Sequence, residues 1–457
     1  MFGKMRKRFL RMAANVDAGG DNPQDESVQY ALEALEILSA VEELLHVSDD
    51  PEEIAMETLK TACAFYQADW AGFIQMDLDL GLWSPYWWYY AGEEDQTRTL
   101  INEFESASHL PHWIKAMHEN TNIIVLDVEK IQKAQPDEYE IYKRLETRSV
   151  IAVPVKPRPV GFLVVRNPQR FASDCRALRM MAYVVLNAIN QKTMFESAQM
   201  AFSPDIIQNE NDILINMFGN LEIYTERGVL KEGELNSPKI YRMIAYMLMS
   251  RKTSVTSYEL AEAVYPGEAV DMDNPGKNLK SLLYRFRQAF ALISSQQLIE
   301  TTLNGYQINS RLNIMTDLEQ FDHCWEVAQQ TASVIHKVEL LKKAIQLYKG
   351  DVLSSITADH WVLQTAAHYR LKYHAIVNEL LKTLMEAKDY SDVMKYATQT
   401  LVVAPENKEA YYWLIRAMRR QGLGEMAKGQ LKLAARNLTE EEYEELTNQL
   451  KRHMGPR

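Results

Sequence analysis

Cysteine, glycine and proline are scarce in this sequence. Its 457 residues include 3 Cys, 18 Gly and 15 Pro, far fewer than disulfide frameworks, collagens or low-complexity chains contain. The three cysteines, Cys63, Cys175 and Cys324, lie more than a hundred residues apart. We therefore interpret them as small core residues of a protein that folds in a reducing cytoplasm.

Patterns typical of membrane spans, metal sites and catalysis are also missing. No stretch approaches the roughly 18 apolar residues of a membrane-spanning helix, and no spacing of Cys and His suggests zinc. The sequence contains no P-loop, GxGxxG, GxSxG, HExxH or protein kinase signature. We predict a protein that is not an enzyme and has no metal site, no resident cofactor and no membrane partner.

Acidic residues outnumber basic ones over the whole chain. The 62 Asp and Glu and the 50 Lys and Arg give a formal net charge of −12, so a DNA-binding function requires a local basic surface. The chain begins with a basic stretch that lacks the apolar core of a signal peptide. We predict a disordered basic tail over residues 1–25.

Residues 26–200 are predicted to form one α+β domain. Apolar residues at helical spacing predict a helix over 26–47, a second one that ends near Phe65, and a closing helix over 174–199. Alternating and continuous apolar runs between these helices predict strands over 70–76, 82–90, 122–126, 149–155 and 160–165. Helices that flank a sheet of five or more strands make one layered domain.

A polar break at residues 201–212 predicts a linker, and residues 213–312 follow as a second domain. This domain is expected to hold a strand pair over 215–224, helices over 238–250, 258–264 and 278–293, and a hairpin over 298–308 with Asn304-Gly305 at its turn. Two helices joined by a short turn, a third helix and a hairpin are the elements of a winged helix-turn-helix. In that fold the third helix enters the major groove of DNA.

Residues 313–457 have helical periodicity throughout. The helices are expected to break at Lys349-Gly-Asp351, Lys388-Asp-Tyr390, Ala404-Pro-Glu-Asn407 and Gln421-Gly-Leu-Gly424. Helix pairs with small and aromatic residues where neighbours interlock, such as Ala397, Ala410 and Trp413, are typical of an all-α tetratricopeptide-like array. An unrelated helical bundle is the alternative.

The third helix of the second domain carries the local basic surface. Between Ser237 and Arg311 the chain has nine basic and six acidic residues, a net charge of +3 within an acidic protein. Opposite its apolar stripe the helix presents Lys277, Lys280, Ser281, Tyr284, Arg285 and Arg287. We predict that these side chains bind phosphates and base edges of DNA. A charged helix face that is merely solvated is the alternative.

Motifs of the second and third domains resemble a single family. The OmpR-type winged helix of SARP-type transcriptional activators is similar to Ser237-Pro-Lys-Ile-Tyr241, Ser254-Val-Thr-Ser-Tyr-Glu-Leu-Ala-Glu-Ala-Val-Tyr-Pro266 and Asn278-Leu-Lys-Ser-Leu-Leu-Tyr-Arg-Phe-Arg-Gln288. The bacterial transcriptional activator domain that follows it in this family is similar to Leu347-Tyr-Lys-Gly-Asp351, Ala404-Pro-Glu-Asn407 and Met418-Arg-Arg-Gln-Gly422.

This resemblance covers about residues 214–450, over half of the chain. It implies a bacterial source and double-stranded DNA as a partner, bound by the six residues of the third helix. It also implies a wing contact near Gly305 and Tyr306. The loop over residues 266–278 is implied to meet RNA polymerase.

The first domain resembles a GAF sensory domain from about residue 38 to 190. The likeness rests on Ala68-Asp-Trp-Ala-Gly-Phe73, Ser149-Val-Ile-Ala-Val-Pro-Val155 and Val160-Gly-Phe-Leu-Val-Val-Arg-Asn-Pro168. It implies a cavity for a small-molecule ligand, on which one aromatic strand could stack through Trp83, Trp87, Trp88, Tyr89 and Tyr90. Alternatively, these aromatic side chains fill the core and a dimer interface. A covalent bilin is not expected, because Cys63 has no histidine beside it.

These expectations combine into one functional prediction. The chain is a cytoplasmic homodimer that binds specific DNA sequences and activates transcription, and a signal at its GAF-like domain modulates it. A dimer suits paired DNA half-sites at fixed spacing. The alternative is a signalling scaffold that does not bind DNA and recruits partners through its GAF and repeat domains.

Overall fold

The computed structural model describes residues 23–452 except for residues 79–80, 92–104, 157–159, 200–201, 236, 252, 267–275, 304, 332 and 358. The predicted tail over residues 1–25 therefore lies almost entirely outside the described residues. The chain divides into two compact units, one of residues 1–199 and 331–336 and one of residues 200–330 and 337–457. Among the described helices, none combines the length and the apolar character needed to cross a bilayer.

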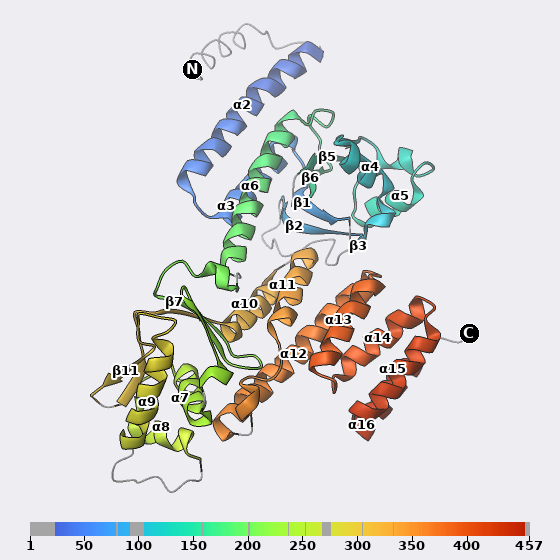
Figure 1. Ribbon diagram of the computed structural model, residues 1–457. Coiled ribbons are helices and arrows are strands. Elements are labelled where there is room, and N and C mark those ends of the chain that lie inside the picture. The colour runs from blue at the N-terminus through green and yellow to red at the C-terminus, as the bar shows by residue number, and fades with distance from the viewer. Residues whose placement is uncertain are drawn as a thin grey trace. The chain divides into compact units, whose positions relative to one another are not determined.

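The first unit is built around a six-stranded antiparallel sheet in the order β3-β2-β1-β6-β5-β4 (Figure 1). Its strands are β1 (Trp70–Asp77), β2 (Leu82–Tyr90), β3 (Glu105–Ser106), β4 (Ile123–Val125), β5 (Val150–Val155) and β6 (Gly161–Arg166). All five strands expected from the sequence are confirmed, and each of their boundaries agrees to within one residue. Strand β3 is an additional short strand at the edge of the sheet.

Helices cover both faces of this sheet (Figure 1). One face is covered by α2 (Pro23–Val47), α3 (Pro51–Tyr66) and α6 (Arg176–Gln199), and the other by α4 (Pro111–Glu119) and α5 (Pro136–Arg144). The three long helices are those expected from the sequence. The sequence reading missed α4 and α5, because nine residues each are too few for a convincing helical period.

Alternation along the strands separates two cores. Leu163 and Val165 of β6 pack towards α3 and α6, whereas Phe162 and Val164 pack towards α4 and α5. Because successive side chains of a strand point to opposite faces, the position of a residue along β6 decides which core it joins. Arg166, at the end of β6, follows this rule on the α4/α5 side.

The second unit begins with a four-stranded sheet in the order β13-β7-β8-β9. It consists of β7 (Asp212–Asn216), β8 (Glu222–Thr225), β9 (Gly228–Lys231) and β13 (Asn313–Thr316), and β13 pairs parallel to β7. The sequence predicted only the β7–β8 pair. The return of β13 to β7 joins residues a hundred positions apart, which no local pattern encodes.

Three helices and a hairpin follow in the expected order. They are α7 (Pro238–Met249), α8 (Ser257–Val264), α9 (Gly276–Phe290), β11 (Ile299–Thr302) and β12 (Gly305–Ile308). The short strand β10 (Val255–Thr256) joins the hairpin in a sheet of order β10-β12-β11. Asn304, expected at the hairpin turn, is outside the described residues.

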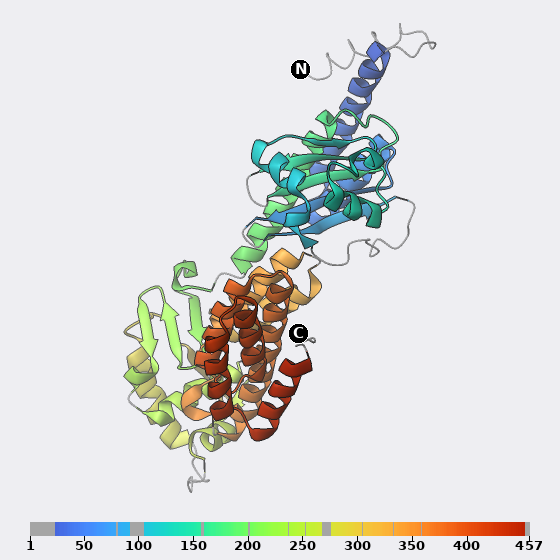
Figure 2. The same ribbon diagram turned by 90° about the vertical axis from the view of Figure 1, so that its right-hand side faces the viewer.

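A run of helices follows in the described part of the second unit (Figure 2). They are α10 (Asp317–Gln330), α11 (Val334–Leu347), α12 (His360–Glu386), α13 (Tyr390–Val403), α14 (Lys408–Arg420), α15 (Gly424–Asn437) and α16 (Glu440–Arg452). All four predicted helix breaks are confirmed. Ala397 and Ala410 are fully buried, so that α13 and α14 approach closely, as the repeat pattern predicted.

Side chains join the α7–β12 segment to the helical region within this unit. Arg242 on α7 donates from Nε to Asp359 Oδ2 at 2.7 Å, and Asp359 is the N-cap residue of α12. Next to this ion pair the ring of Tyr246 packs edge-on against Trp361 at 5.2 Å. Arg242 and Asp359 are mostly buried, so their ion pair is shielded from solvent screening.

Candidate nucleic-acid interface and ligand cavity

Helix α9 is divided into an apolar side and a polar side. Its apolar side is buried and comprises Leu279, Leu282, Leu283, Phe286 and Phe290. Its solvent-exposed side carries Lys277, Lys280, Ser281, Tyr284 and Arg285, which we call the basic face. The predicted amphipathic division of this helix is therefore confirmed.

The basic face carries positive charge that no acidic residue in the described part of the chain pairs with. Helix α9 contains no acidic residue, and Lys277, Lys280 and Arg285 form no ion pair with any described residue. Tyr284 is 62% exposed, and its hydroxyl accepts a hydrogen bond from Gln288 Nε2 at 2.8 Å. Extended cationic side chains beside exposed hydroxyls can reach phosphates and base edges.

Arg287 has a different environment from the rest of the predicted set. Its Nη2 donates to the carbonyl oxygen of Ile299 at 3.0 Å and lies 3.4 Å from Thr301 Oγ1. Both partners belong to β11. Arg287 is thus only half-exposed and ties α9 to the hairpin, whereas the basic face is free of such contacts.

The predicted wing residues lie within the small sheet. Tyr306 is 3% exposed and pairs with Val255 on one side and Thr301 on the other. A Cβ atom at Gly305 would clash with the backbone carbonyl of Val255. The exposed side chain of the hairpin tip is instead that of Leu303.

The turn before α8 is fixed by a capping box. Thr256 Oγ1 accepts a hydrogen bond from the amide of Glu259, and Glu259 Oε2 accepts one from the amide of Thr256 at 2.8 Å. This reciprocal arrangement satisfies two amides at the start of α8. It sets the orientation of α8, against which α9 packs.

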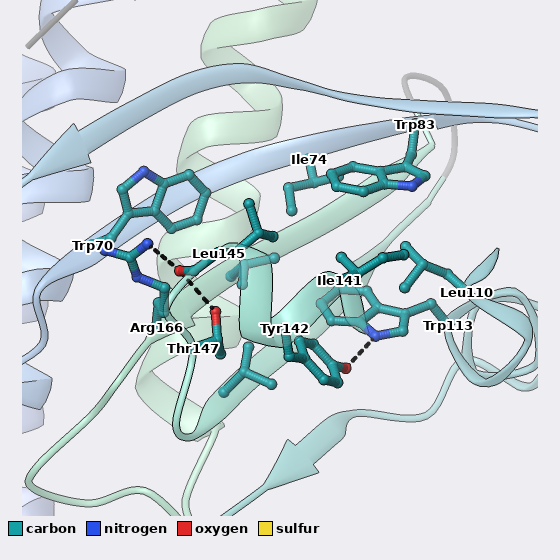
Figure 3. A pocket seen from close by; sticks show the side chains of 12 residues that line it. Trp70, Ile74, Trp83, Leu110, Trp113, Ile141, Tyr142, Leu145, Thr147 and Arg166 are labelled. Atoms are coloured by element: carbon teal, nitrogen blue, oxygen red, sulfur yellow. Dashed lines mark hydrogen bonds between the residues drawn. The ribbon is translucent and has the colours of Figure 1, made fainter. Parts of the chain in front are cut away.

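A cavity of about 50 Å³ lies in the first unit, between the sheet and the helices α4 and α5 (Figure 3). Most of its wall is aromatic or aliphatic. It is lined by Trp70, Ile74, Trp83, Leu110, Trp113, Ile141, Tyr142, Leu145, Thr147, Val150, Val164 and Arg166. An apolar cavity with a few polar groups is the usual form of a small-molecule site.

Polar groups lie at both ends of this cavity, with Arg166 beside Trp70 and the Trp113–Tyr142 pair opposite (Figure 3). Trp113 Nε1 donates to the Tyr142 hydroxyl at 2.6 Å. Burial raises the pKa of Tyr142 above its ordinary value, so this residue stays a neutral phenol. The Nε1 group of Trp83 is buried and has no partner among the described residues.

The five aromatic residues predicted to stack on a ligand do not lie together. Trp83 lines the cavity, and Trp88 and Tyr90 pack on the same side of the sheet. Trp87 and Tyr89 lie on the opposite side, against the core with α3 and α6. The strand therefore contributes one wall residue to the cavity and otherwise fills both cores.

Five polar or aromatic wall residues were not predicted from the sequence: Trp70, Trp113, Tyr142, Thr147 and Arg166. One signal was available. Arg166 ends an otherwise apolar strand, and a charge in such a strand is rarely buried without a functional or structural partner. Trp113 and Tyr142 had no such signal, because they come from the two short helices that the sequence did not reveal.

Neither a metal cluster nor a reactive thiol occurs in the described part of the chain. No group of three or more His, Cys, Asp and Glu could hold a metal ion there. Burial raises the pKa of the Cys63 thiol to about 12, so Cys63 is not an activated nucleophile.

Comparison with known families assigns the C-terminal helices. Residues 316–454 match the model of the bacterial transcriptional activator domain. Helices α10–α16 therefore form this domain, and the chain is related through it to the SARP-type transcriptional regulators that its sequence resembles. A comparison with curated proteins finds no match.

Several solved structures are similar to parts of the chain. Mycobacterium tuberculosis EmbR in complex with a low affinity phosphopeptide is 14% identical, with a TM-score of 0.40 over 54% of this chain and 66% of that one. The phycoerythrobilin-bound GAF domain of a cyanobacterial phytochrome is 14% identical, with a TM-score of 0.29 over 36% and 98%. Free methionine-R-sulfoxide reductase from Neisseria meningitidis is 16% identical, with a TM-score of 0.27 over 39% and 98%. TM-scores this low carry no information on the ligand or the activity of this chain.

Proposed function

We propose that the chain is a sequence-specific DNA-binding regulator that activates transcription, and that a signal sensed at a GAF-like domain over residues 26–200 modulates it. The observation that carries this proposal is the basic face of α9. Lys277, Lys280 and Arg285 are exposed on one helix and have no ion-pair partner among the described residues, in a protein whose net charge is −12. Such a cluster of positive charge attracts and binds a polyanion such as DNA.

The surroundings of α9 support a winged helix of the OmpR type. The order of α7, α8, α9 and the β11–β12 hairpin is that of the motif in which the third helix enters the major groove. In this arrangement Lys280, Ser281 and Arg285 reach base edges and phosphates, and Lys277 and Tyr284 contact the backbone. Arg287 contributes to DNA binding indirectly, because it holds the hairpin beside α9.

Activation is inferred from the neighbouring domain. Helices α10–α16 belong to the bacterial transcriptional activator domain, and Arg242 and Asp359 couple this domain to α7. RNA polymerase is the partner proposed for the loop between α8 and α9. Most of that loop, residues 267–275, lies outside the described residues, and the proposal for it rests on the sequence resemblance.

Selection of genomic DNA fragments by the full chain, followed by sequencing, tests the proposal. Wild-type protein is expected to enrich a repeated motif. The double variant Lys280→Ala/Arg285→Ala is expected to lose this enrichment. If both side chains contact phosphate, the slope of log K against log salt also becomes less negative by about 1.8.

A matched control separates the basic face from total charge. Arg227→Ala/Lys231→Ala removes two exposed cations of the same unit, at the β8–β9 hairpin, and is expected to enrich the same motif as wild type. If both double variants lose motif enrichment equally, the loss reflects the overall charge of the protein and not the basic face. If even wild type retains no fragment at low salt, the DNA proposal fails and a scaffold function takes its place.

A further inference from the structure

Arg166 is a buried cation whose hydrogen-bonding capacity is only partly used. Its side chain is 8% exposed. Nε donates to Asp69 Oδ1 at 2.9 Å, and Nη1 donates to the carbonyl oxygen of Leu145 at 2.8 Å. Nη2 has no partner in the part of the chain that the structure describes. Since a guanidinium carries five N–H groups, three of them are left without an acceptor.

The remaining polar groups of the cavity do not supply that acceptor. Of the described residues that line it, Arg166 alone is charged, and none is a carboxylate. The Leu145 carbonyl already accepts from Arg166 and from the Thr147 hydroxyl at 3.3 Å. Trp83 Nε1 is a second buried donor that has no partner within the described ranges. The cavity is therefore rich in donors and poor in acceptors.

Asp69 balances part of the positive charge without occupying the cavity. Its carboxylate also accepts a hydrogen bond from Asn167 Nδ2 at 2.7 Å, and its side chain is 36% exposed. The Nε side of the Arg166 guanidinium is thus paired with Asp69, and both N–H groups of Nη2 together with the second one of Nη1 remain for another acceptor. Two terminal N–H groups match the two oxygens of a carboxylate.

The size of the cavity limits the ligand. One water needs roughly 10–15 Å³, so about 50 Å³ holds a molecule of only a few non-hydrogen atoms. A tetrapyrrole or a cyclic nucleotide does not fit in this space. The wall beyond Arg166 includes the side chains of Ile74, Trp83 and Trp113 (Figure 3), which favour a short apolar tail.

We propose that this cavity binds a small aliphatic carboxylate, with its oxygens on Arg166 and its alkyl end against the apolar wall. The inference rests on the sensory role proposed for this domain and names the chemical class of its signal. It requires no covalent step.

Ligand-observed saturation-transfer NMR on the full chain tests this proposal, with formate, acetate and propionate as probes. We expect saturable binding of at least one acid, and no binding of propionamide, which lacks the charge. Arg166→Gln is expected to weaken binding about 10- to 100-fold, the effect of losing a hydrogen bond to a charged group.

A second pair of variants leaves Arg166 intact. Val164→Ile adds a methyl group on the cavity side of β6, and Val165→Ile adds the same group on the opposite side, in the core with α3 and α6. Val164→Ile is expected to weaken acid binding at least several-fold more than Val165→Ile. Melting temperatures measured without acid show whether each variant folds.

Three outcomes would overturn the inference: no binding of any of the three acids, equal binding by the two valine variants, or tighter Arg166-dependent binding of nitrate, which would assign the cavity to inorganic oxoanions. Selection of DNA fragments without acid reports separately on the proposed function. A chain that enriches its DNA motif but binds no acid would refute the ligand class alone.

Discussion

Asp317 is a carboxyl group buried where β13 passes into α10. It is 1% exposed, and its oxygens accept hydrogen bonds from the amides of Met217 and Phe218 at 2.8 Å. These amides and Lys349 favour the ionised form, but burial outweighs them and raises the pKa of Asp317 to about 7. The folded chain therefore binds this proton more tightly than the unfolded chain does.

The pH dependence of stability follows from this difference. An unfolded aspartate has a pKa near 3.9, so the contribution of Asp317 to folding becomes less favourable as pH rises from about 4 to about 7. The loss amounts to at most about 4 kcal/mol. Asp317→Asn keeps an acceptor oxygen but cannot ionise. We expect the melting temperature of Asp317→Asn to increase relative to that of wild type as pH rises from about 4 to about 7.

Calorimetry at a series of pH values between 4 and 8 measures this gain. Asp205→Asn changes an exposed aspartate of the short helix Pro204–Ile206 and serves as the control. A constant difference between Asp317→Asn and wild type at every pH would show that Asp317 has an ordinary pKa in the folded chain.

At the scale of elements, the β11–β12 hairpin depends on one glycine. Gly305 lies opposite Thr256 in the pairing of β10 with β12, and a side chain there would meet the backbone of Val255 and Thr256. The hairpin is also held to α9 through Arg287. The close backbone contact at Gly305 therefore fixes the position of the hairpin relative to the basic face.

Gly305→Ala is therefore expected to destabilise the second unit by about 1–3 kcal/mol, the usual cost of overpacking. It is also expected to weaken binding to the selected DNA motif. Gly233→Ala is the matched control, because a Cβ atom at Gly233 in the short helix Glu232–Leu235 meets nothing within 4 Å. Melting temperature and DNA affinity are the measurements. Similar values for the two variants would contradict the structural role of Gly305.

Elements with a long, clear period could be predicted from the sequence. The amphipathic pattern of α9 separated its basic face from Leu279, Leu283 and Phe286 correctly, because a 15-residue helix repeats its period several times. Strands β5 and β6 were equally clear, as continuous apolar runs.

The cavity could not be predicted to the same extent. Its wall joins residues of β1, β6, α4 and α5, and contacts between distant segments leave no local pattern. The aromatic strand β2 misled the sequence reading for a physical reason. Its pairing with β1 shifts register between Phe73 and Ile74, and its side chains alternate between the two cores, so that Trp83 reaches the cavity and Trp87 does not.

At the scale of the whole molecule, the state of assembly depends on what covers α2. This helix has two apolar stripes. Tyr30 and Ala34 are buried in the core that α2 shares with α3 and α6. An apolar stripe of α6 joins the same core, since Leu178, Met181 and Val185 are fully buried in it.

The second stripe of α2 has no partner in the described part of the chain. Val28, Leu35 and Leu45 are each about 40% exposed, and with the partly buried Leu38 they recur at intervals of seven and three residues. This is the spacing of the a and d positions at which two helices pack side by side. The outward stripe of α2 is thus suited to packing against the same helix of a second copy, in the dimer predicted from the sequence.

Sedimentation equilibrium at micromolar concentration is expected to give twice the chain mass of 52.7 kDa for wild type. Leu35→Glu/Leu45→Glu places like charges in the seam and is expected to yield monomers, because buried unpaired charges are not tolerated. Leu371→Glu/Leu433→Glu changes two exposed leucines of α12 and α15 and is expected to remain dimeric. Because paired half-sites require two linked DNA-binding helices, the monomeric variant should also lose preference for a repeated motif over a single half-site. If wild type is monomeric, the basis for a repeated operator is lost. If the α2 variant remains dimeric, the interface lies on another surface than α2.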